Sequence, residues 1–483
     1  MWDYDSVITK TVITPIVCCT FNSTEMVKGG TSLKRALWPL FIVSKLFGIC
    51  PFSIRHERVS YLGTIVSIVM LASYCSFHFI SASDELTDNS SETNFVTMAI
   101  NSFNRYSGIV SLFVIAVMGI VHQKEILNAL QIMHSIDGIF RKEVNIEIDD
   151  SIYSRNIKIG LVSIIAAISV LEYFNCLMFI QSYAPFNEYC LTICLVPFVV
   201  TCITEIQFIA YMQLLKNRLE LINNFFGQFR GDAGKSAKTN IRKSPDPSPL
   251  TTKIFTVNKV GDKLKILSSQ KNGFNGLGTN VIIMENCGKT VGKQWTDNLQ
   301  LNRKLFTEKI MKLQIIYNKM EKFLVQIRSG YSIQIITVFT VKFSIITSML
   351  YACCMILIKS VSTQILTDDD REQLISSSMW ISLMLLEMFS LCYVCHSMET
   401  EARQIGCNIH HFGREIIYHE CKLQVKAFSF ELLHNRIEFR PLGLYKLNLE
   451  FLYNLFGAIS AYLIILIQFD MAQHIVTATS QKL

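Results

Sequence analysis

Apolar stretches of about the length that crosses a bilayer recur seven times along this chain. They cover approximately residues 61–82, 95–121, 157–180, 189–215, 331–358, 374–398 and 446–469. A helix rises about 1.5 Å per residue, so each stretch can span the roughly 30 Å of hydrocarbon in a membrane. A shorter apolar segment, WPLFIVSKLFGICPF at 38–52, contains Lys45 and two prolines, so we expect an interfacial or partly re-entrant helix there.

Apolar residues at three- and four-residue spacing extend three of these stretches beyond the thickness of a membrane. One stripe leaves the fourth stretch, a second leads into the fifth, and a third continues the sixth. The stripes consist of Met212, Leu215, Leu219, Ile222 and Phe226; of Phe306, Ile310, Leu313, Tyr317, Met320, Leu324 and Ile327; and of Ala402, Ile405, Ile409, Phe412 and Ile416. They predict a helical anchor domain in the cytosol, although spacing does not show whether the helices pack within one chain or between chains.

A polar segment separates the first two stripes. Residues 231–300 are rich in Gly, Ser, Thr, Asn and Lys and include SPDPSP at 244–249, so we expect a disordered insert. The expected divisions are a cytosolic N-terminal region with the interfacial helix (1–60), membrane helices one to four with a cytosolic extension (61–230), the insert (231–300), a cytosolic helix with membrane helices five and six and the anchor helices (301–445), and the seventh helix with a short extracellular tail (446–483).

Composition and charge agree with an all-α membrane protein and give it an orientation. Half of the 483 residues are apolar, and only 17% are charged. Segments 1–60 and 399–446 each carry seven Lys and Arg residues, whereas loops 83–94 and 181–188 carry none. Basic residues favour the cytosolic side, so we expect a cytosolic N-terminus and an extracellular C-terminus. The sequon at Asn89 then lies in an outer loop and is a candidate glycosylation site.

This orientation argues against a G-protein-coupled receptor, which places its N-terminus outside the cell. An Asp-Arg-Tyr at the end of the third stretch and an Asn-Pro-x-x-Tyr in the seventh are also absent from the sequence.

Ionisable residues within the apolar stretches each need a partner or water. Arg105 and Glu172 lie at similar depth in the outer half of the second and third stretches. Glu205 and Lys342 share the inner half of the fourth and fifth, and we interpret them as a structural ion pair. Glu387 lies near mid-membrane in the sixth.

Motifs that carry chemistry give little support to an enzyme. The sequence CYVCH at 392–396 matches the spacing of a haem-attachment site, but it lies near the cytosolic end of its stretch, where conditions are reducing. It also lacks the second ligand pair of a zinc site, so we interpret its cysteines as core thiols. We expect no catalytic residue, metal, cofactor or nucleic-acid partner.

The seventh stretch ends in AYLIILIQF at 461–469 and follows the approach RPLGLYKLNLEFLYNLFGAIS. With seven spans, a cytosolic N-terminus and a long second inner loop, this chain resembles the insect gustatory receptors. Their last helix carries Thr-Tyr, five hydrophobic residues and Gln-Phe, and here Ala461 replaces the threonine. The resemblance implies a ligand-gated cation channel, related to the insect odorant receptors, in the plasma membrane of sensory-neuron dendrites.

The resemblance also implies the assembly and the sites. Four subunits would form a homotetramer, or a hetero-oligomer with related subunits, surrounded by membrane lipid. A small-molecule tastant, bitter or plant-derived, would bind in the outer half of each subunit, and the last helix would line the pore. The expected pore residues are Tyr462, Ile465, Gln468, Phe469 and Asp470, with Asp470 at the outer mouth. The candidate ligand residues are Arg105, Glu172, Asn101, Tyr106, Tyr173, Tyr351 and Trp380.

Two other functions remain open from sequence. A metabotropic chemoreceptor would signal without a pore of its own. A secondary transporter should show internal repeats or spans broken at matching positions, and we find neither in the sequence.

Overall fold

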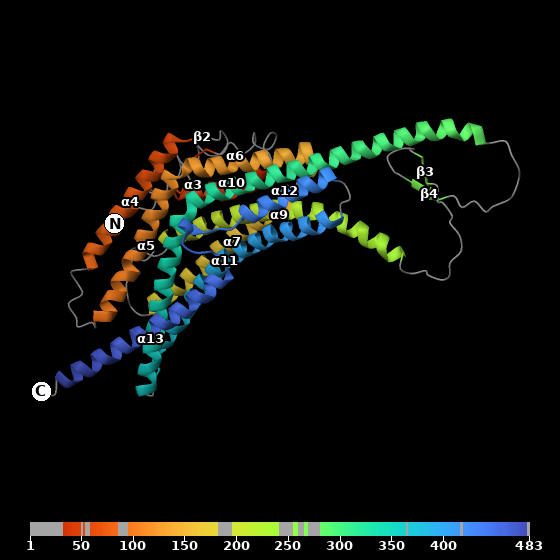
Figure 1. Ribbon diagram of the computed structural model, residues 1–483. Coiled ribbons are helices and arrows are strands. Elements are labelled where there is room, and N and C mark those ends of the chain that lie inside the picture. Colours follow the sequence, from red (N-terminus) through yellow and green to blue (C-terminus); the bar gives the residue numbers. More distant parts are fainter. Residues whose placement is uncertain are drawn as a thin grey trace.

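A computed structural model describes most of the chain (Figure 1). Its described residues are 32–49, 52–53, 58–85, 95–181, 196–240, 255–258, 265–268, 281–363, 366–415 and 419–480. Side chains are described mainly within 32–49, 60–76, 106–171, 196–227, 304–361, 366–414 and 419–472. The sequon at Asn89 lies outside the described residues.

The described residues are almost entirely helical. In chain order the helices are α3 (Ser32–Leu46), α4 (Tyr61–Glu85), α5 (Phe95–Val121), α6 (Gln123–Ile139) with the π-turn η3 (Phe140–Val144), α7 (Ser151–Gln181), α9 (Val196–Asn240), α10 (Val281–Thr363), α11 (Asp368–Glu415), α12 (His419–His434), the 3₁₀ turn η5 (Pro441–Gly443) and α13 (Leu449–Ser480). Two small antiparallel pairs complete the assignment: β1 (Phe52–Ser53) with β2 (Arg58–Val59), and β3 (Phe255–Asn258) with β4 (Lys265–Ser268).

Several of these helices are long and apolar enough to cross a membrane. Five qualify within the described residues: Ser151–Leu171, Val196–Gly227, Lys304–Val361, Asp368–Arg414 and Leu449–Ala472. They correspond to the third to seventh predicted spans. The second belongs to a pair of helices, Tyr106–Val121 and Gln123–Val144, that bends by 61°, and the first contains the shorter apolar helix Tyr61–Ser76.

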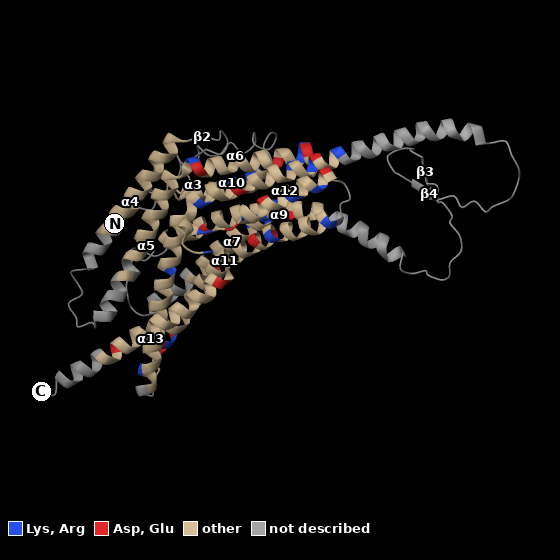
Figure 2. Cartoon of the chain, viewed as in Figure 1, with Lys and Arg blue, Asp and Glu red and all other residues tan. Residues whose placement is uncertain are grey.

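The three apolar stripes pack as the spacing predicts. At one end of the molecule α6, α10, α12, α9 and α11 run side by side (Figure 1). Leu219, Leu313 and Ile405, one from each stripe, are fully buried there. Charged residues gather on this part of the molecule and are sparse on the described parts of α4, α5 and α13 (Figure 2). Extension of the membrane helices into one helical bundle is therefore confirmed, and its cytosolic location stays a prediction.

Buried polar contacts fix this bundle further. Arg218 on α9 is 2% exposed and lies 2.8 Å from both Asp137 on α6 and Asp150 before α7. Tyr153 at the start of α7 donates to the Ala210 carbonyl at 2.9 Å. These contacts link α6 and the start of α7 to α9, which follows them by 57 to 81 residues at the contacting positions.

Helix α3 covers much of the segment 38–52, for which an interfacial or partly re-entrant helix is expected, and it is closely packed within the subunit. Leu37, Leu40 and Phe41 are almost completely buried, and α3 packs on α7 and α9. The amide of Gln207 donates to the buried hydroxyl of Ser44, and Tyr331 donates to the Gln207 oxygen at 2.8 Å. Buried polar partners of this kind hold α3 in the protein core, and its depth relative to the membrane stays a prediction.

Parts of the insert carry regular structure. Within 231–300 the end of α9, the β3–β4 pair and the start of α10 are helical or extended, which differs from the fully disordered segment expected from composition. Side chains of residues 228–303 lie outside the described residues.

Candidate functional site

Three buried charges meet where α9, α10 and α11 cross the interior. The Lys342 ammonium contacts the Glu205 carboxylate and lies 2.6 Å from Oε2 of Glu387. The three side chains are 3%, 3% and 5% exposed. Cys202 donates through its thiol to Oε1 of Glu387 at 3.0 Å. The predicted Glu205–Lys342 pair is confirmed, and Glu387 completes it as a triad that the sequence did not reveal.

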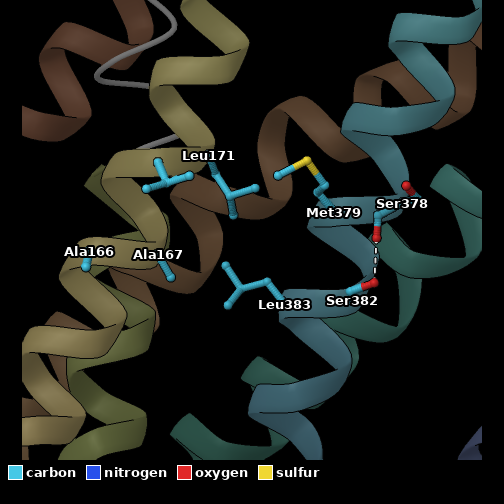
Figure 3. Close-up of a pocket in the computed structure, with 8 residues that line it drawn as sticks. Ala166, Ala167, Leu171, Ser378, Met379, Ser382 and Leu383 are labelled. Carbon is cyan, nitrogen blue, oxygen red and sulfur yellow. Dashed lines mark hydrogen bonds between the residues drawn. The ribbon is translucent and has the colours of Figure 1, made fainter.

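An open pocket lies between α7 and α11 (Figure 3). Its volume is about 520 Å³. The lining residues are Ala166, Ala167, Val170, Leu171, Ser378, Met379, Ser382 and Leu383. The side chains of Leu171, Met379 and Leu383 point toward one another across the gap between the two helices (Figure 3). A volume of this size lies within the range of small-molecule sites.

The polar groups of this pocket are few and partly committed. Ser382 donates to the Ser378 carbonyl at 2.7 Å, and Ser378 donates to the Ile375 carbonyl at 2.8 Å. Each hydroxyl oxygen keeps lone pairs that can accept a hydrogen bond. The pocket therefore suits a mainly apolar molecule that carries a hydrogen-bond donor.

The three candidate ligand residues whose side chains the structure describes do not line this pocket. Trp380 lies beside it in sequence but packs edge to face on Phe198, with ring centroids 5.0 Å apart. Tyr351 is buried elsewhere on α10, and Tyr106 is 43% exposed on α5. The side chains of the remaining candidates, Arg105, Glu172, Asn101 and Tyr173, lie outside the described residues, so their pairing stays a prediction.

Helix α13 carries the Tyr-x₅-Gln-Phe motif on an exposed face. Tyr462, Ile465 and Phe469 are 54%, 49% and 68% exposed, and Gln468 is also exposed. Their spacing of three and four residues places them along one side of the helix. This side is free to meet lipid or another subunit.

Asp470 is turned the other way and is only 1% exposed. It continues the narrow buried stripe of α13, one turn after Leu466 and eleven residues after the buried Ile459. A single subunit therefore does not present this carboxylate at an open outer mouth, which differs from the expected position. Helical register explains the difference, because residue 470 lies about 100° around the helix from Phe469.

The base of α13 is fixed by ion pairs and a tight turn. Lys446 lies 2.6 Å from Glu399 on α11 and 3.2 Å from Glu438, and Arg440 lies 2.6 Å from Glu438. Partial burial alone would raise the pKa of Glu438, but the two cations outweigh burial and lower that pKa. Gly443 adopts φ +76°, a left-handed conformation that suits glycine, in the turn that leads to the helix.

The cysteines of the CYVCH segment are core residues, as interpreted from sequence. Cys392 and Cys395 are buried among the hydrophobic side chains of the main core. In the part of the chain that the structure describes, no group of three His, Cys, Asp or Glu residues is arranged to hold a metal ion.

Comparison with known proteins now decides the family. The sequence matches the family described as 7tm Chemosensory receptor over residues 37–254 and 280–473, which is most of the chain. The protein belongs to this receptor family. Within it, the chain is similar to insect gustatory receptors, so the resemblance carried by the last helix is confirmed.

Named relatives and solved structures agree with this placement. The chain is 22% identical to the Drosophila melanogaster gustatory receptor for bitter taste 66a, over 90% of this chain and 88% of that protein. It is 41% identical to the putative gustatory receptor 2a of the same fly, over 12% of this chain and 14% of that protein. The olfactory receptor OR5 of Machilis hrabei, solved in complex with eugenol, shares the fold with a TM-score of 0.51 at 11% identity, covering 90% of this chain and 98% of that one. Family and apolar helices together make this chemosensory receptor a multi-pass membrane protein.

Proposed function

We propose that this receptor is a tastant-gated, non-selective cation channel of the plasma membrane in gustatory neurons. Four subunits surround a pore lined by α13, and the α7–α11 pocket of each subunit binds the tastant. The exposed face of α13 is the single observation that carries this proposal. An apolar helix whose motif residues Tyr462, Gln468 and Phe469 are exposed in one subunit is suited to line a shared axis.

The pore wall follows from that face. Leu and Ile around the axis form an apolar constriction that can close by dewetting. Gln468 adds a ring of neutral amides near the outer end, where an amide can face water instead of hydrocarbon. Neutral amides discriminate weakly between monovalent cations, so Na⁺ and K⁺ should both pass.

The tastant class follows from the pocket. Its apolar lining and the two serine oxygens suit a compact, mainly apolar compound with a hydroxyl or amine donor. Similarity over most of the chain to a relative named for bitter taste supports a bitter or plant-derived compound.

Whole-cell recording tests the proposal against its alternatives. Cells that express the receptor are exposed to a panel of small plant aromatics that begins with eugenol, with G-protein signalling blocked. We expect a rapid inward current that reverses near 0 mV when Na⁺ and K⁺ are the main cations. Signalling that needs G proteins would favour a metabotropic receptor, and uptake of the compound without current would favour a transporter.

Epitope tags count the receptors at the surface in the same cells and report their orientation. A tag after Leu483 should stain intact cells, and a tag before Met1 only permeabilised cells. The reverse staining would contradict the proposed topology.

A further inference from the structure

The buried triad lies one helical turn from the pocket. Leu383 lines the pocket and Glu387 follows it by four residues on α11. Residues four apart lie on the same face of a helix, one turn apart. A displacement of this part of α11 would therefore reach the Glu387 carboxylate one turn away.

The helix that carries Lys342, α10, also contacts α13 close to the triad. Phe343, the residue after Lys342, packs edge to face on Tyr462 with ring centroids 5.6 Å apart. One turn earlier on α10, Phe339 packs on Phe451 of α13 at 5.4 Å. Adjacent residues of α10 thus hold the triad on one side and the motif tyrosine on the other.

The charges make this link stiff. With both carboxylates ionised, the triad has two negative charges for one positive, and all three groups are buried. Separating Lys342 from either partner would leave an unpaired charge in an interior of low dielectric, which is strongly unfavourable. The three helices are therefore constrained to move together at this level.

We propose that the Glu205–Lys342–Glu387 triad couples the pocket to the pore helix, with Lys342 as the positioning residue. A ligand that displaces α11 at the pocket moves Glu387, Lys342 follows its partner, and α10 shifts Phe343 against Tyr462. This inference rests on the proposed function, because it assigns the route by which the pocket controls the pore.

A double-mutant cycle tests the coupling without a natural ligand. Ala167→Phe fills part of the pocket with an aromatic ring and serves as the probe. Glu387→Gln removes one charge while leaving Lys342 balanced by Glu205, so the fold should survive. The matched control is Asp369→Asn, which removes a charge from an exposed residue at the outer end of the same helix.

We expect Ala167→Phe to change the ligand-free current and Glu387→Gln to abolish that change at unaltered surface expression. The interaction between the two substitutions should be roughly 2- to 30-fold in the ligand-free current, the range found for coupling residues. Asp369→Asn should leave the effect of the probe intact. In receptors that carry current, a probe without effect, or effects that simply multiply, would overturn the inference.

A charge-free variant separates coupling from folding. Glu205→Gln/Lys342→Met/Glu387→Gln keeps similar shapes with no buried charge, so it should reach the surface yet lose the response to the probe. If it responds as the wild type does, the triad is structural only.

A readout that needs no current separates this inference from the proposed function. In Ile465→Cys receptors, which keep the Phe343–Tyr462 contact, the rate of modification by a membrane-permeant maleimide reports the exposure of α13, with the unsubstituted receptor giving the background rate. The probe should change this rate in a Glu387-dependent manner. If the modification rate depends on Glu387 in cells that show no current, the inference is retained and the proposed channel is refuted. If currents are present but the rate does not depend on Glu387, the inference is refuted and the channel is retained.

Discussion

Helices α9 and α13 are both apolar enough to cross a membrane, yet their surroundings are opposite. In the most apolar part of α9, 78% of the residues are buried inside the subunit, against 11% in α13. Helices α3, α5, α7, α10 and α11 all contact α9. The described contacts of α13 are mainly with α10 and α11, and a few are with α5.

The apolarity of a helix therefore does not predict whether lipid or protein covers it. Lipid tails and neighbouring helices are equally apolar, so hydropathy does not separate them. The buried polar groups of a helix do distinguish a neighbouring helix from lipid. Helix α9 carries Glu205, Gln207 and Arg218, each with a polar partner on another element. Among its described side chains, helix α13 instead exposes two amides, Asn454 and Gln468, and buries one polar group, Asp470.

The largest effect should come from truncating matching isoleucines in the two helices. Ile222 of α9 is completely buried and Ile464 of α13 is 56% exposed. Ile222→Ala should cost about 2–5 kcal/mol because it leaves a cavity in a packed core. Ile464→Ala should cost less than about 1 kcal/mol, because surface substitutions seldom exceed that.

Thermal unfolding of the detergent-purified receptor and surface staining both measure this difference. Equal losses in the two variants would mean that α13 is packed as firmly as α9 within its own subunit.

The periodicity of the sequence was sufficient to predict the helical bundle but insufficient to predict the pocket. Leu219, Leu313 and Ile405 recur at helical spacing, and a long amphipathic stripe must be covered by something. Pocket residues such as Ala167 and Leu383 carry no such signal, since an apolar residue in an apolar helix looks the same whether it faces a cavity, a neighbour or lipid.

Polar residues were informative only where depth could be compared. Glu205 and Lys342 could be paired because both lie in the inner half of their spans, and the structure joins them. Glu387 was placed near mid-membrane without a partner, since sequence gives depth but not the direction in which a helix faces. Asp470 shows the same limit, because one position of helical register decides whether it faces outward or into the subunit.

An intermediate effect, on function rather than stability, is expected at Gln468. If the exposed side of α13 lines a pore, Gln468→Ala should change the permeability ratio of Na⁺ to K⁺ or raise the ligand-free leak by a few-fold. Surface expression should not change, because the side chain is exposed in the subunit.

The control is a polar residue on another helix. Gln424→Ala on α12 would break a bond to Gln314 and is unsuitable, whereas Ser390→Ala on α11 alters a half-buried serine whose hydroxyl donates to the Leu386 carbonyl of the same helix. Permeability that is unchanged by Gln468→Ala but altered by Ser390→Ala would move the pore wall away from α13.

The smallest effect concerns the ion pairs that hold the base of α13. Because Arg440 and Lys446 lower the pKa of Glu438 in the folded protein, the ionised carboxylate stabilises this junction. The ionised Glu438 therefore adds to the free energy of unfolding above the unfolded pKa of about 4.3. This contribution is lost as the pH falls through the lower pKa of the folded protein. Arg440 is 49% exposed and therefore screened, so the contribution should stay below about 1 kcal/mol.

Unfolding midpoints at pH 7 and pH 3.5 measure this contribution. The wild type should lose about 1 °C more than Glu438→Gln between the two values, because the variant has no carboxylate to protonate. Glu420→Gln, an exposed acid on α12, should behave as the wild type does. An equal loss in Glu438→Gln and wild type would show that packing alone holds the base of α13. The least buried of the five described helices that can cross a membrane would then not depend on charge at the junction where it joins the bundle.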